Sequence, residues 1–360
     1  MAEDGKRPHA GPGPAEVGNG QGRGENDALG DGAGRSGPAG GASSDPVISL
    51  KGLTRRFREN VAVDGLTLEV RPGELFGIVG PDGAGKTTTL RMLSGVLRPS
   101  EGEGIIHGVD VATDPEGVKP FVAYMSQQFG LYTDLTVLEN IHFYADLYQV
   151  PKGERPARLE RLFAFSNLGP FRDRLAGNLS GGMKQKLGLC CALIHHPRVL
   201  LLDEPTFGVD PISRRDLWLI LHEMVEEGVT VVVSTSYLDE AERCDRVALL
   251  HRGKVLALDT PDALLTLLPG EVVSIGGPEP RQARDLIRKM EGVAGTALFG
   301  NVVHAVLKDG QEARRTLEAA LEEAGLASEE VASVEPSLED VFLHLVRQED
   351  RELEEVGGAP

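Results

Sequence analysis

The chain has 360 residues, a formal net charge of -18 and 5% aromatic residues. At roughly 100–200 residues per domain, this length predicts two domains plus appendages. Because 55 acidic residues outnumber 37 basic ones, broad electrostatic binding to nucleic acid or to anionic lipid headgroups is disfavoured. No apolar stretch approaches the ~20 residues that span a bilayer, and the N-terminal region lacks the apolar core of a signal peptide. We therefore expect a soluble, intracellular protein.

The three cysteines are Cys190, Cys191 and Cys244. Their number and spacing give neither a disulfide framework nor a zinc-binding pattern, which fits a reducing compartment. We expect all three to be small core residues, as unpaired cysteines usually are.

Residues 1–45 contain 13 glycines and four prolines and very few large apolar side chains. Such a segment cannot bury enough surface to offset its ordering entropy, so we predict a disordered tail. An inert extension fits this composition better than a docking tail does. Order is predicted to begin at Pro46, with strands at 47–50 and 61–70 before the turn residues 71–73.

The region from residue 75 to about 268 alternates between apolar runs and helical patterns. The apolar runs predict three buried strands, at 75–79, 199–202 and 229–233. Near-continuous apolar strands separated by helices are typical of a parallel sheet that is covered on both faces. Residues 136–195 have an almost wholly helical pattern, so we predict a helical subdomain, at about 129–195, within a domain at 46–268.

The composition changes after Pro269 and Gly270, because residues 271–360 contain 9 basic and 19 acidic residues. The pattern predicts a βαββαβ order that suggests a small α+β, ferredoxin-like domain at 269–348, ending in a short helix at 338–346. An acidic flexible tail is expected at 349–360. The predicted elements are strands at 271–275, 294–307 (two strands) and 331–335, and helices at 281–290 and 311–324.

The strongest motif is the octapeptide GPDGAGKT at residues 80–87, which matches G-x-x-x-x-G-K-[ST] between an expected strand and an expected helix. Glycines let backbone N–H groups turn towards phosphate oxygens, where the helix dipole adds a favourable field. Lys86 supplies a positive charge for the β- and γ-phosphates, and the Thr87 hydroxyl can ligate Mg²⁺. The predicted nucleotide-binding residues of this turn are Gly80, Asp82, Gly83, Ala84, Gly85, Lys86, Thr87 and Thr88.

A second motif is an apolar strand that ends in Asp203 and Glu204. The carboxyl edge of an open α/β sheet is where ligands bind. There Asp203 can hold Mg²⁺ through water, and Glu204 is free to orient or deprotonate an attacking water. Acids also cap strand ends without any catalytic role, but the turn about 115 residues earlier in the chain favours the catalytic interpretation.

A third motif is LSGGMKQ at residues 179–185. Ser180 followed by Gly181 and Gly182 can form a second exposed helix N-terminus that binds phosphate. The same three residues also serve as an ordinary cap between a loop and a helix, so this motif is only moderately specific by itself.

The three motifs and the DEAE segment at residues 239–242 occur in one order and spacing, which resembles the nucleotide-binding subunit of ATP-binding cassette (ABC) transporters. The resemblance covers about residues 47–268 and implies an α/β P-loop NTPase core that uses ATP and Mg²⁺. It also implies that Ser180, Gly181 and Gly182 bind the γ-phosphate of ATP held by a second cassette. Two protomers would then close head-to-tail over two nucleotides.

The resemblance implies roles for three further residues. Phe57 would stack on adenine, Gln127 would sense Mg²⁺ and the attacking water, and Asp210 would signal across the dimer. Two alternatives remain open at this point. Phe57 has the plain interpretation of a strand-edge hydrophobe, and Gln128 competes with its neighbour for the sensing role.

One position departs from the family pattern. Four residues before Glu240 the family usually has a histidine that contacts the γ-phosphate, whereas this chain has Ser236. A serine hydroxyl is shorter and never cationic, so it should stabilise transition-state charge less well. We hypothesise that this chain hydrolyses its own ATP slowly, and that efficient turnover uses a second, complete cassette. The alternative is a tolerated substitution with Glu204 sufficient for catalysis.

Residues 129–140 and 336–342 are similar to ATPase subunits of drug-resistance, lipid and polysaccharide exporters. The resemblance implies a separate multi-span membrane permease as partner, whose coupling helix would dock on the helices after Gln127. It also implies work at the cytoplasmic face of the cell membrane, with no nucleic acid as partner. The alternative functions are a soluble ABC ATPase with a regulatory or ribosome-associated role and a nearly inactive structural cassette.

Overall fold

The computed structural model of the protein describes residues 45–128, 130–308, 310–326 and 331–357. All of these residues belong to one compact unit, residues 43–360. The disordered tail predicted at residues 1–45 therefore lies outside the described residues, apart from Asp45.

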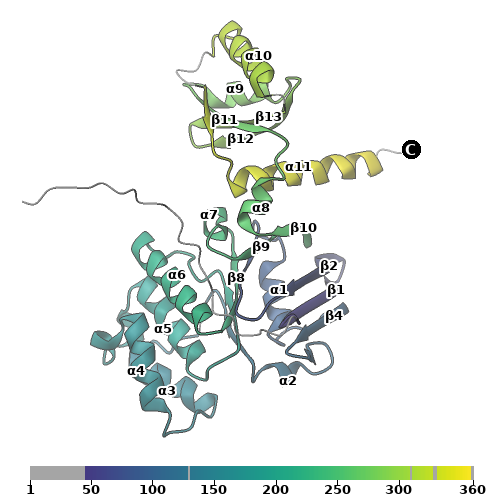
Figure 1. Ribbon diagram of the computed structural model, residues 1–360. Coiled ribbons are helices and arrows are strands. Elements are labelled where there is room, and N and C mark those ends of the chain that lie inside the picture. Colours follow the sequence, from purple (N-terminus) through teal and green to yellow (C-terminus); the bar gives the residue numbers. More distant parts are fainter. Residues whose placement is uncertain (1–44, 129, 309, 327–330, 358–360) are drawn as a thin grey trace, which may run out of the picture. The chain divides into compact units, whose positions relative to one another are not determined.

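The first sheet is antiparallel and has four strands in the order β2-β1-β4-β5 (Figure 1, purple to blue). Its strands are β1 (Ile48–Phe57), β2 (Asn60–Val70), β4 (Glu101–Ile106) and β5 (Val109–Asp110). The strands predicted at 47–50 and 61–70 are present. The first continues as far as Phe57 because its later residues pair with β2 up to Asn60.

The second sheet has six strands in the order β10-β9-β3-β8-β7-β6. They are β3 (Leu75–Val79), β6 (Val122–Met125), β7 (Val199–Asp203), β8 (Thr230–Thr235), β9 (Arg246–His251) and β10 (Lys254–Asp259). All neighbouring pairs are parallel except the β9–β10 hairpin. In β7, Leu200 and Leu202 enter one hydrophobic core while Val199 and Leu201 enter the other, as strand alternation requires. The predicted parallel sheet with two covered faces is confirmed.

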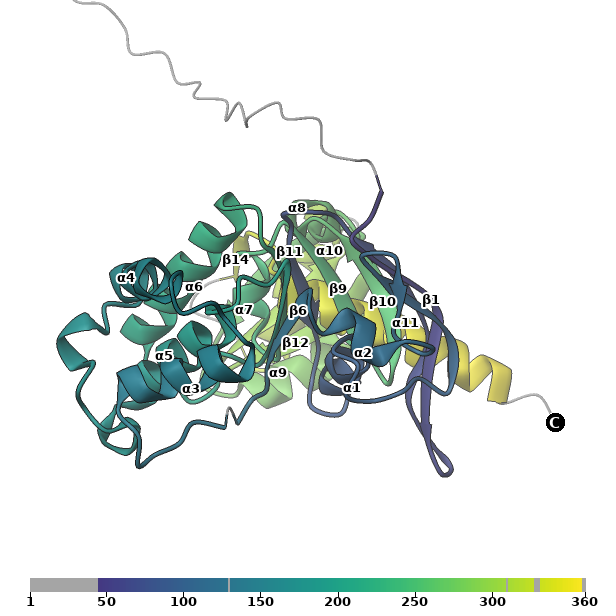
Figure 2. The same ribbon diagram turned by 90° about the horizontal axis from the view of Figure 1, so that it is seen from below.

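Helices cover both faces of this sheet (Figure 2). Helix α1 contacts β2 of the first sheet as well as β7 and β8, whereas α5 and α6 contact strands β6 and β8 respectively. The segment predicted to be helical, 136–195, contains α3, α4 and α5. The helices of this region are α1 (Lys86–Leu93), α2 (Pro115–Val118), α3 (Val137–Leu147), α4 (Arg155–Ser166), α5 (Gly181–Leu193), α6 (Pro211–Glu226), α7 (Leu238–Ala241) and α8 (Pro261–Leu265).

The C-terminal region forms a third, antiparallel sheet in the order β12-β13-β11-β14. Its strands are β11 (Glu271–Gly276), β12 (Val293–Phe299), β13 (Val302–Leu307) and β14 (Val331–Val334), with helices α9 (Pro280–Ile287) and α10 (Gly310–Glu323). This is the predicted βαββαβ order, and it supports the ferredoxin-like assignment, which stays a prediction. The apolar stripe of α10 packs into the sheet through Ala313, Leu317 and Leu321.

The last helix differs from the expectation of a short helix followed by a flexible acidic tail at 349–360. Helix α11 runs over Leu338–Gly357, so the acidic segment is helical as far as the structure describes it. The start of α11 is anchored by Leu338, Val341 and Phe342, which are buried in a core of the preceding domain. Further along, Glu349 pairs with His251 at 2.7 Å and Asp350 with Arg252 at 2.8 Å. These ion pairs hold two of the acidic residues against the preceding domain, although the composition of the segment predicted a flexible tail.

Cys190, Cys191 and Cys244 are buried and free, as predicted. Burial raises the pKa of each of the three thiols above its ordinary value. Within the described ranges, none of the helices combines the length and the apolar character that crossing a membrane requires.

Candidate functional site

The glycine-rich turn at residues 80–87 connects β3 to α1, as predicted. Gly85 has φ 104°, and a Cβ at this position would lie 2.6 Å from the carbonyl oxygen of Ala62. Only glycine fits this close approach and left-handed backbone. No acidic residue lies in the first turn of α1, so the positive end of the helix dipole and its free N–H groups are available to an anion.

Lys86, the first residue of α1, is buried, with a side chain that is 4% exposed. Its ammonium group donates to the carbonyl oxygens of Gly80 at 2.8 Å and Pro81 at 3.1 Å. It also lies 3.1 Å from Oε1 of Glu204. A buried ammonium needs compensating oxygen atoms, and here two carbonyls and a carboxylate provide them. The same group is therefore positioned to exchange a carboxylate partner for a phosphate.

Asp203 ends β7 and accepts three hydroxyl hydrogen bonds. Oδ1 accepts from Thr87 Oγ1 at 2.9 Å and from Ser234 Oγ at 2.8 Å, and Oδ2 accepts from Tyr124 Oη at 3.1 Å. Burial, followed by the charge of Asp203, raises the pKa of Tyr124 to about 12, so the phenol stays a donor at neutral pH. The carboxylate is thus fixed in direct contact with the turn that holds Lys86.

Glu204 has a left-handed backbone, φ 48°, which is uncommon for a residue with a side chain and costs roughly 1–3 kcal/mol. Its backbone N–H is held by the carbonyl and hydroxyl oxygens of Ser234, both at 3.1 Å. This turn directs the carboxylate towards Lys86, and Gln127 Nε2 donates to its second oxygen at 3.3 Å. Strain of this kind clusters at functional sites.

Lys86, Gln127 and Glu204 line one cavity of about 690 Å³, which we call the P-loop cavity. Phe57, which is 43% exposed, also lines it, and its ring lies 4.6 Å from the guanidinium carbon of Arg55. Gln127 lines the cavity whereas Gln128 does not, which favours Gln127 for the sensing role. The lining residues are Phe57, Asn60, Val61, Ala62, Asp82, Gly83, Ala84, Gly85, Lys86, Thr87, Thr88, Gln127, Glu204 and Arg252.

Seven predicted residues lie outside that lining, namely Gly80, Ser180, Gly181, Gly182, Asp203, Asp210 and Ser236. Ser236 follows β8 and is half-buried. Ser180 caps α5 by accepting from Met183 N at 3.3 Å, and Asp210 caps α6 by accepting from Ser213 N at 3.0 Å. The two caps adjoin, because a Cβ on Gly182 would lie 2.3 Å from the side chain of Ser213. Gly181 begins α5.

Several residues of the site were missed by sequence reasoning. Tyr124 and Ser234 provide hydroxyl groups from the strands on either side of β7, and strand order cannot be deduced from the motifs. Arg252 lies in the β9–β10 turn and reaches the cavity. Glu240, 1% exposed, accepts from Thr206 at 2.9 Å and Thr235 at 2.6 Å, which ties together the loops that follow β7 and β8. The one signal available in the sequence was the strand TVVVST at 230–235, whose polar last residues indicate hydroxyl groups at the edge of the sheet.

The donor set at the edge of the sheet fits a magnesium ion. Thr87, Gln127 and Asp203 offer a hydroxyl, an amide and a carboxylate, and Mg²⁺ prefers oxygen ligands, with few protein ligands supplemented by phosphate and water. The orientation of Thr87 towards Asp203, at 2.9 Å, brings two of these oxygens together beside the turn.

A glycine-rich turn on a helix N-terminus, beside an acid-ended strand of a parallel sheet, defines the class of P-loop nucleoside triphosphatases. The comparisons with known proteins are more specific. A family profile described as "ABC transporter" matches residues 63–207. The daunorubicin resistance ATP-binding protein DrrA2 of Streptomyces coeruleorubidus is 34% identical over 86% of this chain and 98% of its own length. The chain therefore belongs to the ABC transporter ATP-binding proteins, a family of ATPases.

Other relatives agree. The Nod factor export ATP-binding protein I of Ralstonia nicotianae is 34% identical over 88% of this chain and 98% of its own length. The probable multidrug ABC transporter ATP-binding protein YbhF of Escherichia coli is 43% identical over 84% of this chain. The chain spans about half of that relative, 52% of its length.

Solved structures support the same fold. A structure described as an ATP binding subunit of an ABC transporter has a TM-score of 0.56 and 31% identity, covering 61% of this chain and 92% of its own. The ATP-binding cassette MJ0796, described as a dimer in a post-hydrolysis state bound to ADP and Pi, has a TM-score of 0.54 and 27% identity over 59% of this chain and 98% of its own. The ABC ATPase fold predicted from the motifs is confirmed.

Proposed function

We propose that this chain is the ATP-hydrolysing subunit of an ABC exporter that works with a membrane permease. The observation that carries the proposal is the P-loop cavity, where the glycine turn, Lys86 and Glu204 meet, with Asp203 beside it in contact with Thr87. The relatives support the exporter branch, since their names describe daunorubicin resistance, Nod factor export and probable multidrug transport.

In the proposed site, Lys86 and the N–H groups of the turn hold the β- and γ-phosphates of ATP. Thr87, Asp203 and Gln127 would hold Mg²⁺, which would supply positive charge to neutralise the phosphates. The ammonium group of Lys86 would exchange Glu204 for phosphate oxygen, which frees that carboxylate. Glu204 then orients and deprotonates the attacking water, while Gln127, 3.3 Å away, keeps the carboxylate in place. The adenine ring would stack on the exposed face of Phe57.

We further propose that Ser180, Gly181 and Gly182 bind the γ-phosphate of ATP held by a second cassette. Their position outside the lining of this chain's own P-loop cavity is compatible with that role. The contact of Gly182 with Ser213, which Asp210 caps, gives Asp210 a short physical route to the segment 180–182. Closure of the dimer would move the permease between inward- and outward-facing states at the cytoplasmic side of the membrane.

The serine at position 236 is proposed to slow this chain's own site. A hydroxyl at the end of β8 lacks the reach and the charge of an imidazole, so less of the developing transition-state charge would be stabilised. Pairing with a complete cassette, whose ATP is covered by Ser180 of this chain, would restore turnover.

One experiment distinguishes the proposed transport function from the alternative, a soluble regulatory ATPase. The tagged chain is purified from detergent-solubilised membranes and, separately, sedimented with ribosomes. Copurification with a multi-span membrane protein that raises the Mg-ATPase rate of the wild type, but not of Glu204→Gln, supports the proposal. Cosedimentation with ribosomes, with no membrane partner and no such stimulation, would overturn it in favour of a soluble regulatory ATPase.

A further inference from the structure

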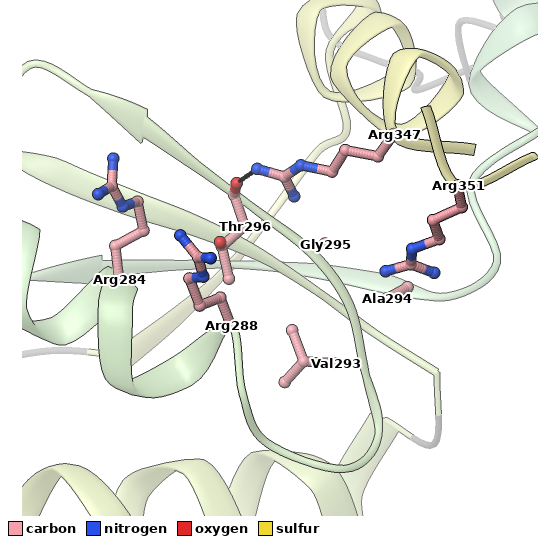
Figure 3. A pocket seen from close by; sticks show the side chains of 8 residues that line it. All are labelled: Arg284, Arg288, Val293, Ala294, Gly295, Thr296, Arg347 and Arg351. Atoms are coloured by element: carbon pink, nitrogen blue, oxygen red, sulfur yellow. Dashed lines mark hydrogen bonds between the residues drawn. The ribbon is translucent and has the colours of Figure 1, made fainter. Parts of the chain in front are cut away.

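A second cavity, of about 420 Å³, lies in the C-terminal region, away from the motifs of the ATPase family. Four arginines line it, two from α9 and the turn after it and two from α11, with the start of β12 between them (Figure 3). We call it the arginine pocket, and its lining consists of Arg284, Arg288, Val293, Ala294, Gly295, Thr296, Arg347 and Arg351.

The arginine pocket concentrates positive charge in an acidic part of the chain. Residues 271–360 contain only 9 basic residues against 19 acidic ones, yet four of the nine line this cavity and none of the acidic residues that the structure describes does. Two acids of α11 that lie between Arg347 and Arg351 in the sequence, Glu349 and Asp350, pair with His251 and Arg252 instead. Four cations therefore face one cavity in a region whose net charge is negative. An anionic ligand in the cavity would balance their charge.

The guanidinium groups have few partners within the described residues. Arg284 pairs with the adjacent Asp285 at 2.7 Å, and Arg347 donates to the carbonyl oxygen of Thr296 (Figure 3). Neither Arg288 nor Arg351 has a carboxylate within ion-pair distance among the residues that the structure describes. Burial, followed by repulsion from Arg288, Arg351 and Arg284, lowers the pKa of Arg347. Guanidinium groups that repel one another across a cavity are stabilised by an anion placed between them.

The backbone adapts to this arrangement. The pairing of β12 with β13 shifts register between Val293 and Gly295, which bends a strand locally. A Cβ on Gly295 would lie 2.9 Å from Nη1 of Arg347. The absence of a side chain at Gly295 thus lets the guanidinium lie against the start of the strand, at the wall of the cavity.

We propose that the arginine pocket binds an anionic ligand that carries phosphoryl groups. A planar guanidinium group binds phosphate oxygens through two parallel hydrogen bonds. Four guanidinium groups offer more donors and more positive charge than a single carboxylate can satisfy, which favours a ligand with phosphoryl groups. The volume lies within the roughly 300–1,000 Å³ range of small-molecule sites, which accommodates a diphosphate or a phosphorylated headgroup. This site is separate from the P-loop cavity and does not depend on the proposed transport function.

The first experiment uses inorganic pyrophosphate as the probe. The full chain is titrated calorimetrically in a Lys86→Ala background, which weakens binding of the probe at the P-loop cavity. We expect binding that the double variant Arg288→Ser/Arg351→Ser weakens by at least about tenfold, since hydrogen bonds to charged groups are among the strong ones. The matched control is Arg281→Ser/Arg315→Ser, which removes the same charge from exposed positions of α9 and α10 and should bind as the parent does.

A second arm distinguishes a free phosphate from a lipid headgroup. Flotation with vesicles that contain phosphatidylglycerol, compared with phosphatidylcholine alone, measures headgroup binding of the same three proteins, namely the Lys86→Ala parent and its two double variants. Binding of pyrophosphate or of anionic vesicles that is lost only in the Arg288/Arg351 variant supports the proposal and identifies the source. The proposal is overturned if neither probe binds, or if the control variant loses binding equally, since the effect would then be one of overall charge.

Discussion

The P-loop cavity and the arginine pocket are both cationic sites, but they are built in different ways. In the P-loop cavity the cations have anionic partners, because Lys86 pairs with Glu204 and Arg252 with Asp350. In the arginine pocket one guanidinium group, that of Arg284, pairs with an adjacent acid, Asp285, and none of the acidic residues that the structure describes lines the space between the four groups. A site with internal counter-charges must exchange partners to bind an anion, whereas a site with fewer of them can bind an anion without losing an ion pair.

The two sites also differ in how they are encoded. The P-loop cavity depends on a contiguous octapeptide and on two adjacent acids, so short motifs reveal it. The arginine pocket depends on two pairs of arginines, each spaced i,i+4 on or just after a helix, that meet only because α9 and α11 pack beside β12. The comparison predicts that removing a charge has opposite consequences at the two sites.

The largest effect is expected for Glu204→Gln. This change removes the proposed general base while keeping the size of the side chain, so the steady-state Mg-ATPase rate should fall by at least about 100-fold. ATP affinity should be retained, since Lys86 no longer has a carboxylate competitor. Glu223→Gln, on the exposed side of α6, is the control and should keep the rate. A Glu204→Gln chain with half of the wild-type rate would remove Glu204 from the chemistry.

A smaller change, this time an increase in the ATPase rate, is expected for Ser236→His. An imidazole at the end of β8 should reach the transferred phosphoryl group and stabilise its charge, raising the ATPase rate of the purified chain by about tenfold, below what a full oxyanion donor supplies. The rate is measured at saturating Mg-ATP so that affinity does not contribute. An unchanged rate would show that the serine is a tolerated substitution.

The next effect is a loss of stability when a cation that has an ion-pair partner is removed. Arg252→Gln leaves Asp350 of α11 without its partner, a pair that is about half-exposed, so the free energy of unfolding should fall by up to about 1 kcal/mol. Urea denaturation at low and high salt checks this, with the loss smaller at high salt because screening weakens the pair. A gain in stability would contradict the assigned pairing.

The smallest expected effect is a gain in stability, opposite in sign to the loss expected for Arg252→Gln. Arg288→Gln removes one of four mutually repelling charges, so the same denaturation assay at low salt should show stability raised by about 0.3 kcal/mol. Arg315→Gln, on the exposed face of α10, is the control and should change stability less. If Arg288→Gln instead destabilises the chain as Arg252→Gln does, Arg288 has a stabilising counter-charge of its own and the comparison fails.

The parallel sheet was predictable because its strands are unbroken apolar runs, whereas the ABC ATPase assignment depended on the resemblance of the motifs. Residues 75–79 form β3 with the predicted bounds, since all five residues are buried between two layers. The end of α11 was not predictable in the same way. Its acidic residues have the composition of a flexible tail, and only the contacts of Glu349 and Asp350 with the β9–β10 hairpin explain a helix there.

The candidate site was predictable where one motif carries several groups. Lys86, Thr87, Asp203 and Glu204 meet as expected, because two strand ends of one parallel sheet lie at the same edge. Tyr124 and Ser234 escaped prediction because a hydroxyl on a neighbouring strand becomes a partner only when the strand order β8-β7-β6 is known. The contribution of Ser180 depends on a second cassette, which a single chain does not contain.

The most direct test of the account is a calorimetric titration of Lys86→Ala with Mg-ATP, since the central claim is that this buried ammonium binds nucleotide phosphates. Lys119→Ala, which removes an exposed lysine, is the control, and circular dichroism establishes that both variants fold. The account predicts that Lys86→Ala binds ATP at least about tenfold more weakly than the wild type, as loss of a charged contact requires, while Lys119→Ala binds normally. Wild-type affinity in a folded Lys86→Ala chain would contradict the nucleotide site and everything proposed from it.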